Sequence, residues 1–121
     1  MFEGSTFEAP VLTGMGPHAA SALKMVFAAW TMGCAAMLLA TARAAEGLGV
    51  MEALEAEWEQ SMPDLLARLE RIRGAVVPKA WRWVGEMLEI SSAFESAGEP
   101  GGFHRSAAEV YERIAAERKE A

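Results

Sequence analysis

Three side chains of this sequence have the chemistry for a binding or catalytic role: Lys24, Thr31 and His104. Lys24 precedes residues 25–42, which carry no charge, and partial burial there would ease the loss of its proton. Alternatively, Lys24 only caps the apolar run and extends its amine to water. Thr31 follows two helical turns later and offers a hydroxyl, which in a helix commonly bonds to the chain's own backbone.

His104 lies just after Gly101-Gly102, where the last helix is expected to begin. It is a candidate substrate contact or acid/base group, and the alternative is a surface histidine near a helix N-terminus. Two histidines, one cysteine and scattered carboxylates form no metal-ligand spacing, so no metal site is expected.

The elements that position these residues are all predicted to be helices. Pro17 suits a first helical turn, and Gly47-Leu48-Gly49 suits the end of the same helix. Further helices are expected over residues 50–60, 65–76, 79–97 and from 103 onward, with Ser61 as the N-cap of the third. No segment alternates as a strand would. The sequence therefore predicts an all-α fold of about five helices around one long, alanine-rich central helix.

Apolar side chains recur at helical spacing in the last two predicted helices. One stripe is Trp83, Met87, Ile90 and Phe94, and the other is Phe103, Ala107, Val110 and Ile114. Such stripes need a surface to cover, so the charge-free helix is interpreted as a core helix wrapped by its neighbours rather than a membrane span. Trp30, Trp81 and Trp83 are interpreted as core or interface aromatics rather than a cofactor platform.

Composition narrows the class of protein further. The 121 residues are 52% hydrophobic and 23% charged, which excludes a disordered chain. The net charge of −6 argues against a nucleic-acid partner. A single cysteine, Cys34, excludes an internally disulfide-bonded scaffold, and the first residues lack the basic stretch of a signal peptide. A cytoplasmic protein is expected, with an irregular arm over residues 1–16 and one helical domain over residues 17–121.

Several segments together resemble one enzyme superfamily. A glycine-containing turn, Gly14-Met15-Gly16, leads into a long helix with a lysine in its second turn. That arrangement is similar to the 6-phosphogluconate dehydrogenase and β-hydroxyacid dehydrogenase superfamily, and most of all to a branch in which a helical domain follows a Rossmann domain. The segments that carry this closer resemblance are Ala20-Ser21-Ala22-Leu23-Lys24-Met25, Ala28-Ala29-Trp30-Thr31, Lys79-Ala80-Trp81-Arg82-Trp83-Val84-Gly85-Glu86-Met87 and Gly102-Phe103-His104-Arg105.

The resemblance implies a role for Lys24 beside the nicotinamide and the substrate oxygen. There it would act as a general acid/base or donate a hydrogen bond to a developing alkoxide. Thr31 and His104 would be substrate contacts. Phe27 and Ala28 occupy positions that are polar in better-known members, which implies a different or more apolar substrate.

The resemblance also implies what this chain lacks. A nicotinamide cofactor needs a strand, a glycine-rich turn and a helix to hold its pyrophosphate, and no such unit is present in the sequence. We therefore expect the C-terminal substrate-binding and dimerisation domain of an NAD(P)-dependent dehydrogenase, inactive without its Rossmann domain. Its expected partners are a second copy and that Rossmann domain, with no membrane. The alternative is a stand-alone helical module that forms homo-oligomers without enzymatic activity.

Overall fold

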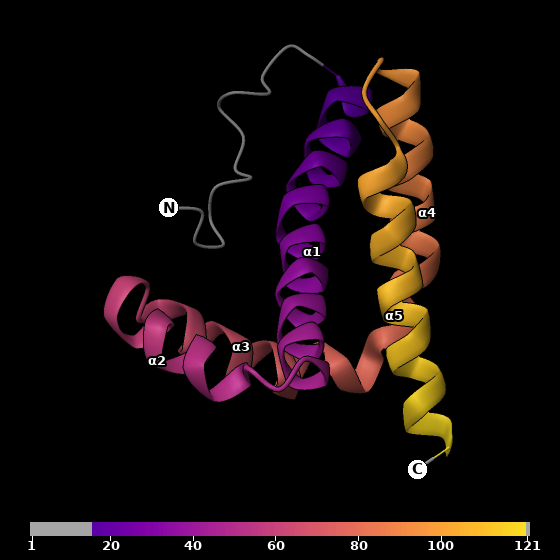
Figure 1. The fold of residues 1–121 in the computed structure, drawn as a ribbon. Helices are drawn as coiled ribbons and strands as arrows, with labels where there is room; N and C mark the ends of the chain where they lie inside the picture. The colour runs from indigo at the N-terminus through magenta and orange to yellow at the C-terminus, as the bar shows by residue number, and fades with distance from the viewer. Residues whose placement is uncertain (1–15, 121) are drawn as a thin grey trace.

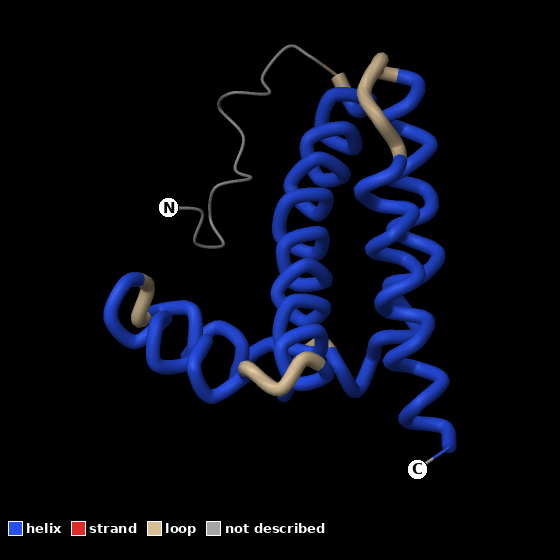
Figure 2. Tube along the Cα trace, viewed as in Figure 1, coloured by secondary structure: helices blue, strands red, loops and turns tan. Residues whose placement is uncertain are grey.

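The computed structural model describes residues 16–120, which form five α-helices and one 3-10 helix, with no strand in that range (Figures 1 and 2). The elements are α1 (Pro17–Gly47), α2 (Met51–Ser61), α3 (Asp64–Ala75), η3 (Val77–Lys79), α4 (Ala80–Ser96) and α5 (Gly102–Glu120). The predicted all-α class is confirmed. Of the predicted irregular arm, residues 1–15 lie outside the described part of the chain.

Helix α1 is the longest element, with 31 residues and therefore a length of about 46 Å. It begins at Pro17, whose missing N–H would have had no partner in a first turn. At the other end the amide of Val50 donates to the carbonyl of Ala45, and Gly49 takes a φ of 76°. That left-handed conformation costs glycine little, so the predicted termination at Gly47-Leu48-Gly49 is confirmed.

Helices α4 and α5 form an antiparallel pair that lies alongside α1, whereas α2 and α3 lie across its C-terminal end (Figure 1). The core is where α1, α4 and α5 meet. Tyr111 and Met87 have no exposed surface there, and Ile90 has 1%. The predicted stripe of α4 is confirmed, because Met87 and Ile90 are buried and Trp83 and Phe94 pack against them.

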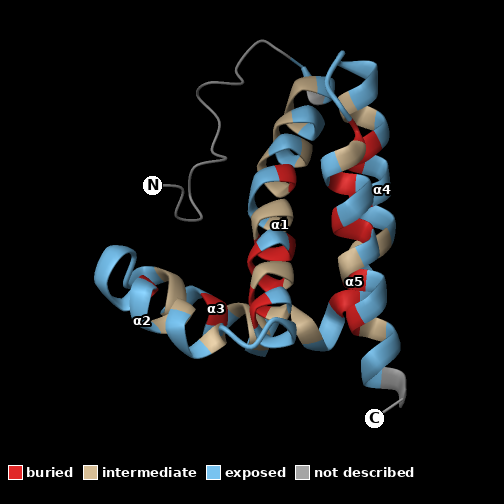
Figure 3. Cartoon of the chain, viewed as in Figure 1, coloured by how far each residue is buried: buried red, intermediate tan, exposed pale blue. Residues whose placement is uncertain are grey.

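The prediction that α1 is wrapped on all sides is wrong. Ala36, Leu39 and Ala42 are buried, but Val26, Trp30 and Met37 are 53%, 73% and 65% exposed. Figure 3 shows burial concentrated in the C-terminal half of α1, where helices lie on two sides. By length and composition the segment His18–Gly47 could cross a membrane, because an 18-residue stretch within it has a mean hydropathy of 1.7, although a core helix passes the same test.

Two smaller expectations also fail. Ser61 does not cap α3, because it ends α2 and its hydroxyl donates back to the carbonyl of Glu57 at 2.9 Å. Phe103 is 69% exposed rather than part of the buried stripe of α5. The first turn of α5 places Phe103 on the solvent side and His104 on the side that faces α1.

Candidate functional site

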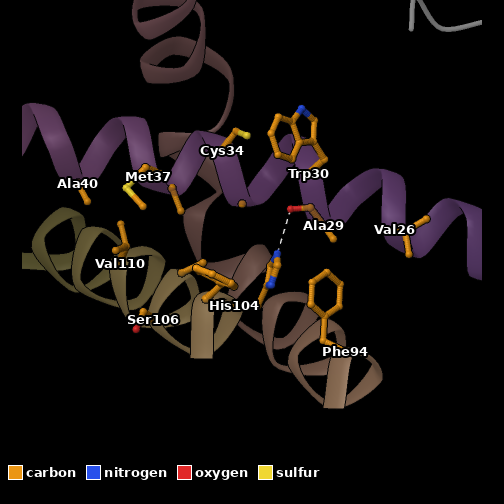
Figure 4. Close-up of a pocket in the computed structure, with 14 residues that line it drawn as sticks. Val26, Ala29, Trp30, Cys34, Met37, Ala40, Phe94, His104, Ser106 and Val110 are labelled. Atoms are coloured by element: carbon orange, nitrogen blue, oxygen red, sulfur yellow. Dashed lines mark hydrogen bonds between the residues drawn. The ribbon is translucent and has the colours of Figure 1, made fainter. Parts of the chain in front are cut away.

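His104 is buried between α5 and α1, and only 6% of its surface is exposed. Its Nε2 lies 3.0 Å from the carbonyl oxygen of Ala29, so the N–H on that nitrogen donates across the helix interface (Figure 4). The ring also meets Phe94 of α4 edge-on, with 4.7 Å between ring centroids. The alternative of a surface histidine is therefore wrong.

A glycine makes this close approach of the two helices possible. A Cβ added to Gly33 would lie 3.0 Å from His104 Nε2 and 3.5 Å from its Cδ2. Any side chain at that position would push the imidazole away from α1. A glycine inside a helix costs about 1 kcal/mol relative to alanine, and here the histidine contact supplies a reason for it.

The turn before α5 is held in place by a small polar network. The buried Ser91 hydroxyl donates to the carbonyl of Gly101 at 2.8 Å. Arg105 Nη1 donates to Glu95 at 2.7 Å and to the Ser91 hydroxyl at 3.3 Å. These contacts fix the start of α5 against α4, and therefore the direction in which His104 points.

An apolar groove of about 560 Å³ runs between α1 and α5 above His104. We call it the α1–α5 groove; the residues that line it are Val26, Ala29, Trp30, Gly33, Cys34, Ala36, Met37, Ala40, Phe94, Phe103, His104, Ser106, Ala107 and Val110. None of these is an aspartate, glutamate, lysine or arginine. Figure 4 shows the α1 and α5 side chains on either side, with His104 and Phe94 between the helices. Grooves of this size and polarity accept apolar groups.

Lys24 and Thr31 do not join His104. They are seven residues apart on α1, so they share one face, about 20° apart around the axis, whereas Ala29 lies about 140° away from Lys24. Both are exposed. The expected partial burial of Lys24 is absent in this chain, because no described element covers that face at the N-terminal half of α1. The Thr31 hydroxyl donates to the carbonyl of Phe27 at 3.2 Å, the backbone bond that sequence considerations favoured.

Two other polar groups near the groove, the Cys34 thiol and the Tyr111 hydroxyl, are unreactive. Burial raises the pKa of the Cys34 thiol, which keeps it protonated rather than a reactive thiolate. Burial likewise raises the pKa of Tyr111, whose hydroxyl donates to the carbonyl of Met32 at 2.6 Å. Tyr111 therefore acts as a second link between α5 and α1.

Among residues 16–120, no three His, Cys, Asp or Glu side chains gather as a metal site would require. Within that range, Lys24 and Thr31 lie apart from His104, so the candidate residues form no acid/base pair. What it offers is an apolar groove and, on a different face of the same helix, an exposed lysine with a threonine two turns away.

Sequence considerations missed Tyr111 and did not connect Gly33 or Phe94 with His104. A glycine inside an otherwise apolar helix was the available signal for a close approach by another helix. Nothing in the sequence indicated that the approaching side chain would be His104. The hydrogen bond from His104 to Ala29 joins positions 75 residues apart, which periodicity cannot connect.

Comparison with known proteins adds a family assignment. No curated protein and no solved structure matches the chain. Residues 45–114 match a family described as a domain of unknown function, DUF1932. The match begins in the last turn of α1, covers α2 to α4 and reaches Ile114 of α5; it includes His104, whereas Lys24 and Thr31 precede it. Since it spans more than half of the chain, this protein belongs to the DUF1932 family.

Proposed function

We propose that this chain is the substrate-binding and dimerisation domain of an NAD(P)-dependent dehydrogenase and is inactive by itself. The proposal is supported by the resemblance described above and by the family, whose domain is known as the C-terminal helical domain of 6-phosphogluconate dehydrogenase-like proteins. The observation that carries it is the exposed face of α1 with Lys24 and Thr31, which no described helix covers.

The cofactor does not fit the residues described. Holding a dinucleotide pyrophosphate takes a strand, a glycine-rich turn and a helix in that order, and residues 16–120 contain no strand. The nucleotide is therefore assigned to a separate Rossmann domain. This chain contributes the amine of Lys24, which gives or takes a proton at the substrate oxygen, and the apolar surroundings of Phe27 and Ala28.

Lys24 gains the desolvation that its role requires only when that second domain arrives. In this chain Lys24 is exposed to water on the face of α1 that no described helix covers. A domain that covers the N-terminal half of α1 would exclude water from the lysine. The isolated chain is therefore expected to be catalytically inactive, because the position of Lys24 on the exposed face of α1 leaves it in water.

A direct test is to identify the Rossmann domain encoded with this chain, in the same or an adjacent reading frame, and to assay the pair. The absorbance of the reduced cofactor reports turnover. We expect oxidation or reduction of NAD(P) only when both parts are present. The proposal fails if no nucleotide-binding domain is encoded there, or if the complete protein turns over no nicotinamide cofactor with any of the 2-hydroxy or 3-hydroxy acids tried.

The second candidate is a stand-alone module that forms homo-oligomers without chemistry. The observation that favours it is the apolar face of α1 that none of residues 16–120 covers, with Trp30 73% exposed. The same assay separates the two functions, because the module would show self-association without turnover in any combination.

A further inference from the structure

Both ring nitrogens of His104 are turned away from solvent. Nε2 lies 3.0 Å from the carbonyl oxygen of Ala29, to which its N–H donates. With that proton on Nε2, the neutral ring leaves Nδ1 as an acceptor. Nδ1 is buried and has no hydrogen-bond partner among residues 16–120. Because an acid/base group must come within hydrogen-bond reach of the proton that it transfers, this geometry favours a different role for His104.

The bond from His104 reaches α1 close to Lys24. Side chains of α5 and α3 make hydrogen bonds or ion pairs with α1 at four described positions, which are Ala29, Met32, Arg43 and Glu46. Of these, Ala29 is the nearest to Lys24, at a distance of about 7.5 Å along the helix axis. Met32 is the next, about 12 Å from Lys24 along the same axis.

The position of Lys24 is sensitive to the loss of the nearer contact. Without the bond to Ala29, Met32 becomes the nearest of the four contacts. A tilt of about 10° that pivots there moves the backbone of Lys24 by about 2 Å over the 12 Å of helix between them. A displacement of about 1 Å can cost a catalytic group about 100-fold in rate. The bond to Ala29 therefore matters for the placement of the Lys24 amine.

His104 is itself firmly held. Its ring meets Phe94 of α4 edge-on, with 4.7 Å between the centroids, and a Cβ at Gly33 would lie only 3.0 Å from Nε2. Figure 4 shows the imidazole between α5 and α1, with its bond to Ala29 dashed. The bond from Ser91 to the carbonyl of Gly101 fixes the turn that precedes α5. A donor held in this way can position a neighbouring helix.

We propose that His104 is a positioning residue: its bond to the carbonyl of Ala29 holds the end of α1 that carries Lys24, and the imidazole does not touch the substrate. This inference rests on the proposed function, in which Lys24 gives or takes a proton at the substrate oxygen. Gly33 belongs to the same arrangement, because the absence of a side chain there lets the ring approach α1.

Hydrogen exchange of the full chain, followed by mass spectrometry, tests this role of His104 without a cofactor. His104→Leu keeps a side chain of similar size but removes the donor, whereas His104→Gln supplies another N–H. We expect the amides of residues 21–28 to exchange roughly fivefold faster in His104→Leu than in the wild type, the factor for one lost hydrogen bond. His104→Gln should recover protection of these amides. Residues 36–45 should exchange as in the wild type.

Two further variants keep the test decisive even if His104→Leu fails to fold. Gly33→Ala pushes the imidazole away from α1 and should have the same local effect on residues 21–28. Tyr111→Phe is the matched control, because it loses a bond of the same kind, 2.6 Å long, to the carbonyl of Met32. That carbonyl lies beyond Ala29 as seen from Lys24, so residues 21–28 should keep their protection.

Three exchange results would overturn the proposal. Residues 21–28 could exchange in His104→Leu and Gly33→Ala as they do in the wild type. Tyr111→Phe could accelerate their exchange as much as His104→Leu does. Finally, both His104 variants could accelerate exchange equally in every helix, which would show a general loss of stability rather than the release of one helix end.

The catalytic part of the proposal is measured in the chain combined with the Rossmann domain that the proposed function requires. His104→Leu should lower kcat by about 10- to 100-fold and leave the KM for NAD(P) unchanged, since only the placement of Lys24 is altered. An unchanged kcat would overturn the positioning role. If no combination turns over NAD(P), the proposed function fails, whereas the exchange experiment still decides whether His104 holds the end of α1.

Discussion

Replacing Gly33 with alanine tests whether His104 sets the distance between α5 and α1. The new Cβ would lie 3.0 Å from His104 Nε2. The imidazole has little room to retreat, because it is 6% exposed and lies against Phe94. Moving it would also lengthen its 3.0 Å contact with the carbonyl of Ala29.

Two opposing terms decide the sign. Alanine is more favourable than glycine inside a helix by about 1 kcal/mol. Forcing an extra methyl group into a packed region costs about 1–3 kcal/mol, and weakening the hydrogen bond costs up to about 1 kcal/mol more. We expect Gly33→Ala to lower the free energy of unfolding by about 1–2 kcal/mol, balancing these principles.

Gly85→Ala is the matched control. Gly85 lies inside α4, and a Cβ there would meet nothing within 4 Å. The same substitution should therefore stabilise the protein by about 1 kcal/mol. Urea unfolding followed by circular dichroism measures both variants, at one fixed protein concentration because self-association shifts apparent stability.

A second arm uses the His104→Ala background. With the ring removed, Gly33→Ala should change sign and become stabilising by about 1 kcal/mol. The reasoning is refuted if Gly33→Ala stabilises the native background as much as Gly85→Ala does. That comparison stands even if His104→Ala fails to fold.

Two further predictions concern the links of α5 to α1. Tyr111→Phe should lower the free energy of unfolding by about 1 kcal/mol, since the ring stays buried but its 2.6 Å bond to the Met32 carbonyl is lost; an unchanged urea midpoint would contradict this. The hydrogen bond from Arg43 lowers the pKa of Glu117. The exposed pair therefore stabilises the folded protein above the ordinary carboxyl pKa, and this stabilisation is lost as the pH falls through the lowered pKa. Glu117→Gln should therefore lose slightly less stability on acidification than the wild-type protein does. High salt should abolish this difference between the two proteins. Equal acid sensitivity of the variant and the wild type in low salt would show that the pair contributes nothing.

Local patterns predicted most of the helices well. The proline at the start of α1, the glycines after it and the stripe of α4 are signals that depend only on neighbouring residues. Helix ends were predicted correctly where a glycine or a proline determines them. The prediction of Ser61 as an N-cap failed because its hydroxyl had two possible partners. It donates to the carbonyl of Glu57 in the preceding helix.

The site was less predictable because it depends on contacts between distant segments. A helix without charges can be a buried core or a half-covered surface, and only the placement of α2 to α5 decides between them. Phe103 and His104 illustrate the difficulty: they are adjacent, and a small rotation of α5 relative to the predicted stripe exposes the phenylalanine and buries the histidine. In the proposed function, the surroundings of Lys24 likewise depend on a second domain.

The most direct test of the central claim is Lys24→Met in the chain combined with the Rossmann domain that the proposed function requires. Lys24 is exposed on α1, so loss of the amine should leave the fold and the KM for NAD(P) unchanged. We predict that kcat falls by about 100- to 10,000-fold, the range for loss of a general acid or base. Lys79→Met, at an exposed lysine of η3, is the matched control and should retain full activity. Equal activity of the two variants would contradict the assignment of Lys24 and, with it, the proposed role of α1.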